Sequence, residues 1–157
     1  MAAKVYLETT IPSYLAARPS RDLIASAHQQ ITVEWWQTRR PGFELYVSQL
    51  VLEEAALGDR DTAERRLGYL VGIPSLAITL AAQSLARALL TSGPLPAKAA
   101  ADALHVAIAA ANGMDYLLTW NIRHLANATI RRGIEEACQR AGWLAPVLCT
   151  PEELMEG

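Results

Sequence analysis

Cysteines and long apolar runs are both scarce in this chain. Its 157 residues include only two cysteines, in no metal-type spacing, so neither a zinc site nor a disulfide framework is expected. The most apolar stretch, residues 99–111, is interrupted by Asp102 and His105 and is shorter than the roughly 18 residues of a membrane span. An acid at Glu8 comes too early in the chain for the apolar core of a signal peptide. We therefore expect a cytoplasmic protein with no membrane segment.

Neither sign of charge is in large excess. The chain has 14 Lys+Arg against 16 Asp+Glu, with 52% hydrophobic and 19% charged residues. This composition excludes a disordered chain and a generally polybasic nucleic-acid coat protein, so any nucleic-acid site must be local. A chain of this length suits one domain that buries about 70% of its unfolded surface. We therefore expect a single domain over residues 1–157.

Strand-like and helix-like segments alternate along the chain. Strands are expected at residues 4–8, 44–48, 75–79, 115–119 and 146–149. Helices are expected to begin at the Thr9–Thr10 pair and to span residues 22–40, 49–57, 61–71 (capped by Asp61), 80–91, 96–113, 122–126 and 129–141. This alternation predicts a parallel α/β sandwich of three layers, in which ligands bind beyond the carboxyl ends of the strands.

Four polar residues end a strand or interrupt an apolar helix face: Glu8, Glu54, Asp102 and Asn121. An ionised carboxylate among apolar side chains is costly unless it is paired or bound to a cation. Asp102 has Lys98 one turn earlier as an alternative partner, and Glu54, like its neighbour Glu53, has a solvent-facing alternative. If the carboxylates converge, they form an oxygen site for Mg²⁺ or Mn²⁺ rather than for zinc.

Four blocks of the sequence resemble, in the same order, the motifs of the PIN-domain family. They are residues 5–15 (VYLETTIPSYL), 47–54 (VSQLVLEE), 102–109 (DALHVAIA) and 117–125 (LLTWNIRHL). The resemblance covers almost the whole chain. It implies a Rossmann-like parallel sheet and a metal-dependent endoribonuclease, most often the VapC-like toxin of a bacterial toxin–antitoxin pair.

The resemblance also implies which residues carry out the chemistry. Glu8, Glu54 and Asp102 would bind Mg²⁺ or Mn²⁺, and Asn121 would join them in a catalytic set that hydrolyses RNA phosphodiester bonds. His105 lies one turn after Asp102 on the same helical face. For His105 we favour a packing role over a metal or acid–base role.

Three further residues are candidates for contact with RNA or with the water shell of the metal. Arg123 follows the strand end near Asn121, where a phosphate would lie, and a guanidinium group suits that ligand. Thr10 and Thr119 have hydroxyl groups at strand ends, which serve equally well as turn or cap hydroxyls.

The expected partners are an RNA substrate, a cognate antitoxin protein and a second copy of the chain. Homodimers are the common oligomer. A helical surface that includes Trp35, Trp36, Leu67 and Leu70 is more apolar than a domain of this size needs. This surface and the resemblance together predict a homodimer, and the resemblance implies that it also binds an antitoxin.

Two departures from the family pattern bear on activity. Glu8 stands where most members have aspartate, and Asn121 where they have a further aspartate, so the three remaining carboxylates favour one tightly bound metal over two. These departures leave open a catalytically degenerate module that keeps the PIN fold only for interaction.

A phospho-acceptor receiver domain is disfavoured, because it needs a lysine on a late strand and this chain has only Lys4 and Lys98.

Overall fold

A five-stranded sheet lies at the centre of the protein, in a computed structural model that describes residues 2–155. Its strands are β1 (Lys4–Leu7), β2 (Glu44–Ser48), β3 (Ser75–Leu76), β4 (Tyr116–Leu118) and β5 (Val147–Cys149). Their order across the sheet is β3-β2-β1-β4-β5, and every neighbouring pair is parallel. The structure thus confirms the parallel sheet that the sequence predicts.

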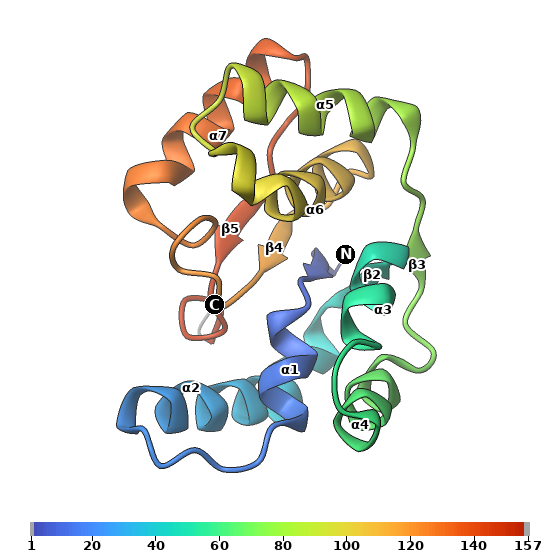
Figure 1. The fold of residues 1–157 in the computed structure, drawn as a ribbon, viewed down its shortest axis with the longest axis vertical. Helices are drawn as coiled ribbons and strands as arrows, with labels where there is room; N and C mark the ends of the chain where they lie inside the picture. The colour runs from blue at the N-terminus through green and yellow to red at the C-terminus, as the bar shows by residue number, and fades with distance from the viewer. Residues whose placement is uncertain (1, 156–157) are drawn as a thin grey trace.

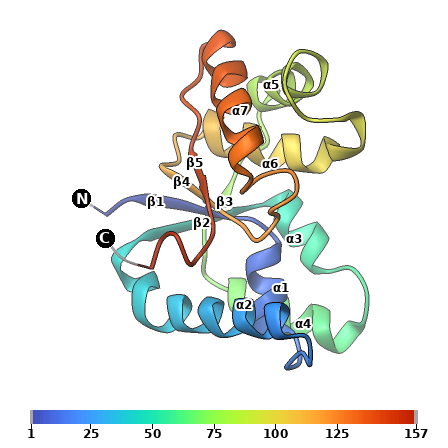
Figure 2. The same cartoon turned by 90° about the vertical axis from the view of Figure 1, so that its left-hand side faces the viewer.

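Helices cover both faces of the sheet. The α-helices of the described residues are α1 (Thr10–Ala16), α2 (Leu23–Glu34), α3 (Gln49–Ala55), α4 (Arg60–Leu70), α5 (Leu80–Thr91), α6 (Ala100–Ala111) and α7 (Ala128–Arg140). Figure 1 shows α5, α6 and α7 on one side of the sheet and α1, α2 and α4 on the other, and Figure 2 shows the same layers from the side. The three-layer α/β sandwich is therefore confirmed. Within residues 2–155, none of these helices combines the length and apolarity needed to cross a bilayer.

The order of the strands creates a switch point between β1 and β4. From β1 the sheet continues through β2 to β3 on one side, and from β4 to β5 on the other. Leu7 at the end of β1 is in register with Leu118 at the end of β4, and the Glu8 amide donates to the Leu118 carbonyl at 3.0 Å. Glu8 and Thr119 therefore flank the crevice in which open parallel sheets bind their ligands.

Beyond the exposed Lys4, the strand β1 that precedes this crevice is completely buried. Val5, Tyr6 and Leu7 are each 0% exposed, because helices cover both faces of a parallel sheet. On one of these faces, α6 packs closely against α5 and contains many alanines, whose small side chains permit the close approach. His105 on α6 is 1% exposed. Packing therefore fixes the positions of the residues from which the crevice is built.

The helix predicted over residues 22–40 changes type before it ends. α2 stops at Glu34, a π-helical turn follows at Trp35–Arg39, and a 3₁₀ turn at Arg40–Gly42 leads into β2. The π turn has more residues per turn than an α-helix, so its neighbouring side chains point in more similar directions. Trp35 and Trp36 are accordingly both buried, Trp35 stacked on Phe43.

The apolar surface predicted for dimer formation lies mostly in the interior. Trp35 is 0% exposed, Trp36 8% and Leu70 4%, and Leu67 is half-buried against the core. The prediction that these side chains form a free apolar surface was wrong, because they are already covered within one copy of the chain. The large apolar side chains that are more than two-thirds exposed lie elsewhere, and among them are Leu23, Ile24, Val71, Leu80 and Leu144.

Three local predictions are wrong in detail. The N-terminal cap of α4 is Asp59 rather than Asp61, because the Asp59 carboxylate accepts a backbone amide hydrogen bond at 3.0 Å. Residues 122–126 form turns instead of a short helix. The strand predicted to reach residue 79 ends at Leu76, and Thr79 instead caps α5.

Two glycines make a test of this fold because alanine should have opposite effects at them. A Cβ at Gly93, just after α5, would lie 2.6 Å from the Leu89 carbonyl oxygen, so the backbone would have to move. At Gly68, within α4, a Cβ meets nothing within 4 Å. We expect Gly93→Ala to lower the free energy of unfolding by about 1–3 kcal/mol. Gly68→Ala should raise it by about 0.5–1 kcal/mol.

Urea denaturation of both variants checks this prediction. Equal effects of the same sign would contradict the packing described around the end of α5.

Candidate metal centre

Glu8 is a buried carboxylate at the end of β1. Its Oε1 atom accepts hydrogen bonds from the Thr10 amide at 3.1 Å, the Thr10 hydroxyl at 2.5 Å and the Thr119 hydroxyl at 2.7 Å. The residue is only 5% exposed, and within residues 2–155 no basic side chain pairs with it. Three donors thus hold one oxygen, and the Oε2 atom has no protein partner in this part of the chain.

Glu54 reaches the same place from α3. Its Oε1 atom accepts a hydrogen bond from the Thr9 hydroxyl at 2.5 Å and lies 2.8 Å from Nε2 of His105. Burial raises the pKa of Glu54, but its interaction with His105 and the hydrogen bond from the Thr9 hydroxyl together lower it by more. The pKa of Glu54 therefore lies below its ordinary value, and the side chain is an ionised carboxylate near neutral pH.

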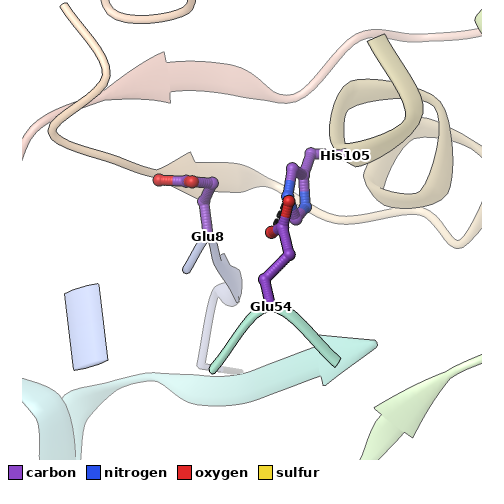
Figure 3. A group of neighbouring side chains, drawn as sticks. All are labelled: Glu8, Glu54 and His105. Atoms are coloured by element: carbon purple, nitrogen blue, oxygen red, sulfur yellow. Dashed lines mark hydrogen bonds and ion pairs between the residues drawn. The ribbon is translucent and has the colours of Figure 1, made fainter. Parts of the chain in front are cut away.

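His105 is the member of this centre that sequence reasoning missed. It projects from α6 beside both glutamates, as Figure 3 shows. One carboxylate oxygen from Glu8, one from Glu54 and a ring nitrogen of His105 all lie within 4.8 Å of one another. The expectation of a packing role placed His105 in the core correctly but overlooked its contact with Glu54.

Asp102 lies one turn before His105 on α6 and has two partners. Its Oδ1 atom accepts from Nδ2 of Asn121 at 2.8 Å, and its Oδ2 atom is 3.1 Å from Nδ1 of His124. The backbone N–H of Asn121 also donates to the Thr119 hydroxyl at 2.9 Å. Asp102 is thus joined to Glu8 through Asn121 and Thr119, whereas the Lys98 partner considered from the sequence does not form an ion pair with it in the described structure.

The structure brings most of the predicted residues into one hydrogen-bonded network. Thr10 and Thr119 both bind Glu8, so their hydroxyls hold a carboxylate. Arg123 is exposed in the turn that follows Asn121. Membership of Asp102 in the metal-binding cluster itself stays a prediction.

Besides His105, four polar residues that form hydrogen bonds in this centre were not predicted as site residues: Tyr6, Ser48, Thr9 and His124. For His124 the sequence did hold a signal. It follows Asn121 by three residues, as His105 follows Asp102, and this spacing places two side chains on one side of a turn.

The donor set of the Glu8–Glu54–His105 cluster fits a divalent cation. The carboxylates of Glu8 and Glu54 lie close together. In each, Oε1 accepts hydrogen bonds from protein donors and Oε2 has no protein partner among the described residues. Carboxylates held this close together, with no lysine or arginine paired to either among the described residues, repel each other, and a cation would relieve that repulsion. Carboxylate oxygens suit Mg²⁺ and Mn²⁺, and an imidazole suits transition metals such as Mn²⁺ better than Mg²⁺.

All four sequence blocks that resemble the PIN-domain motifs meet at this centre. Residues 5–15 and 117–125 flank the switch point, residues 47–54 carry Glu54, and residues 102–109 carry Asp102 and His105. Blocks that lie far apart in the chain therefore contribute to one site. Neither a comparison of the chain with models of protein families nor one with curated proteins finds a match.

Proposed function

We propose that this protein is a metal-dependent endoribonuclease of the PIN type, which hydrolyses RNA phosphodiester bonds at the Glu8–Glu54–His105 cluster. The observation that carries the proposal is a pair of neighbouring glutamates at the switch point of the sheet, Glu8 buried and Glu54 partly buried, each with one oxygen that has no partner among the described residues. The proposed cation is Mg²⁺ or Mn²⁺. The four blocks that resemble the PIN-domain motifs support the choice of RNA as substrate.

The side chains of the centre have separate tasks in this reaction. A bound divalent cation would supply Lewis-acid polarisation of the phosphate and of the attacking water. Glu8 and Glu54 would hold that cation, and Asp102 would contribute from α6, since each of its oxygens keeps a lone pair beyond its one hydrogen bond. Hydrolysis joins the water oxygen to phosphorus and breaks one backbone P–O bond. The proton released by the water has these carboxylates as its nearest bases.

The RNA backbone is the expected ligand of Arg123. This guanidinium lies exposed in the turn after Asn121, at the same end of the sheet as the glutamates. The chain as a whole has a formal net charge of -2, so contact with a phosphate depends on local cations of this kind. Thr10 and Thr119 act indirectly in this proposal, because their hydroxyl groups already bind Glu8.

A cognate antitoxin and a second copy of the chain are the further partners that we propose. Both partners rest on the resemblance to PIN-domain toxins alone, because the apolar surface first predicted to form the dimer is mostly buried within one copy. Failure of the product of an adjacent gene to co-purify would contradict the antitoxin. Sedimentation of a monomer at high micromolar concentration would contradict the dimer.

Cleavage of a structured RNA pool tests the proposed activity. Protein treated with EDTA should be inactive, and Mg²⁺ or Mn²⁺ should restore cleavage. Glu54→Gln should lower the rate by about a hundredfold or more, because it removes a negative ligand while keeping the shape of the side chain. Glu53→Gln is the matched control, since Glu53 is the exposed neighbour of Glu54 on α3 and should be neutral.

Equal cleavage by wild type and Glu54→Gln would show that the activity belongs elsewhere. Metal binding without any cleavage would instead favour a catalytically degenerate interaction module.

A further inference from the structure

A buried chain of hydrogen bonds runs from β2 to the metal centre. The Ser48 hydroxyl lies 2.7 Å from the Tyr6 hydroxyl, which lies 2.8 Å from Nδ1 of His105. Nε2 of the same ring lies 2.8 Å from Oε1 of Glu54. Ser48 and Tyr6 are 0% exposed and His105 is 1% exposed, so solvent does not compete for these groups. The reaction proposed above does not use this chain of hydrogen bonds.

The groups at the two ends of this chain of hydrogen bonds, Ser48 and Glu54, determine which atom of each pair donates the proton. Ser48 caps α3 by accepting the Val51 amide, so its own proton is available to the Tyr6 oxygen. The Tyr6 hydroxyl is 0% exposed and accepts the Ser48 proton, so its own proton is left for Nδ1 of His105 at 2.8 Å. The ring then carries its proton on Nε2 and donates to Glu54.

The opposite direction leaves two groups unsatisfied. The Ser48 proton would have no acceptor among the described residues. The unprotonated Nε2 of His105 would face a carboxylate oxygen of Glu54 at 2.8 Å, which places two lone pairs against each other. Only the direction from Ser48 toward Glu54 gives every buried polar group a partner, as buried groups require.

This arrangement determines which oxygen of Glu54 faces the cation. Oε1 already accepts from both His105 and Thr9, so the carboxylate cannot rotate without breaking two hydrogen bonds. We propose that His105, with its tautomer set by Tyr6, is a positioning residue that presents Oε2 of Glu54 to the cation and is not itself a ligand. The inference rests on the proposed cation site and assigns a task to two residues that the reaction does not otherwise use.

Binding of Mn²⁺ alone, followed by the electron paramagnetic resonance signal of the free ion, tests this role without any RNA. His105→Leu removes the donor and should weaken Mn²⁺ binding by about 10–100-fold, the usual effect of losing a partner of a metal ligand. His105→Gln restores an N–H donor to Glu54 and should recover most of that affinity. Tyr6→Phe removes the group that selects the tautomer and should also weaken binding.

Tyr46→Phe is the control for Tyr6→Phe. Tyr46 lies opposite Tyr6 in the register of β1 and β2, and its hydroxyl forms no hydrogen bond within the described residues. This variant should bind Mn²⁺ as wild type does. Thermal melts in EDTA identify any variant that fails to fold, and Tyr6→Phe and His105→Gln keep the inference testable if His105→Leu does so.

Several results would overturn the inference. Unchanged Mn²⁺ affinity in folded His105→Leu would show that His105 does not position Glu54. A nitrogen coupling in the spectrum of bound Mn²⁺, with His105→Gln as weak as His105→Leu, would make His105 a ligand instead. If wild type binds no Mn²⁺, the cation site fails together with the proposed function. Metal binding that behaves as expected in protein that cuts no RNA would leave the positioning role intact and contradict only the proposed function.

Discussion

Replacing Glu8 by glutamine is expected to abolish the stabilisation that Mn²⁺ gives to the folded protein. At a concentration of 100 times Kd, a ligand that binds only the folded state adds about 2.7 kcal/mol to the free energy of unfolding. Glutamine can still accept the hydrogen bonds of Thr10 and Thr119 through its Oε1 atom. Its amide nitrogen, however, replaces the Oε2 atom that would face the proposed cation, and an amide N–H cannot bind a metal ion.

Urea unfolding of Glu8→Gln with and without Mn²⁺ gives the measurement. In EDTA the variant should be at least as stable as wild type, because a 5% exposed carboxylate without a basic partner is replaced by a neutral side chain. Glu44→Gln is the matched control: Glu44 is exposed at the opposite end of the neighbouring strand β2, and its variant should keep the full Mn²⁺ effect. An undiminished Mn²⁺ effect in Glu8→Gln would contradict the proposed site.

The second large effect is expected for Asp102→Asn, which should lower the rate of RNA cleavage by about a hundredfold or more. Asparagine keeps the shape of the side chain and can still accept from Asn121 through its oxygen. It loses the negative charge that Asp102 offers between Asn121 and His124. The helix should therefore survive, while the cation is held less tightly and the transition state is stabilised less.

Initial cleavage rates and Mn²⁺ affinities of the same variant separate these two effects. Unchanged Mn²⁺ affinity with a reduced rate would contradict Asp102 as a ligand, and an unchanged rate would contradict its catalytic role. Arg123→Ala is the comparison, since this exposed arginine is proposed to contact phosphate only. It should weaken RNA binding, reduce the slope of its salt dependence by about one, and leave Mn²⁺ binding intact.

The fold and the two glutamates could be predicted because their signals are local. Alternating strands and helices specify a parallel sheet, and an acid that follows a buried strand stands out, as Glu8 does after Leu7. Glu54 was identified differently, by its place on the helix after the second strand and by the resemblance of residues 47–54 to a PIN-domain motif, which favours it over Glu53. These features need only the few residues on either side.

His105 was missed because its partners are distant in the sequence. A histidine on an apolar helix face has the pattern of a packing residue, and its contacts with Glu54 and Tyr6 span 51 and 99 positions. The burial of both tryptophans, where adjacent helical positions favour burial of one, was missed for a different reason. A helical pattern with 3.6 residues per turn does not describe the π turn at Trp35–Arg39, so the faces of these side chains could not be predicted from spacing.

The turn between β1 and α1 has a consequence for how this chain can vary in length. Two consecutive residues hold two different acids, since Thr9 binds Glu54 and Thr10 binds Glu8. The spacing of the two carboxylates is therefore tied to a single peptide unit, whose Cα atoms are about 3.8 Å apart. One inserted or deleted residue at this turn would separate the two acids, whereas the exposed connection at residues 17–22 can lengthen without moving either of them.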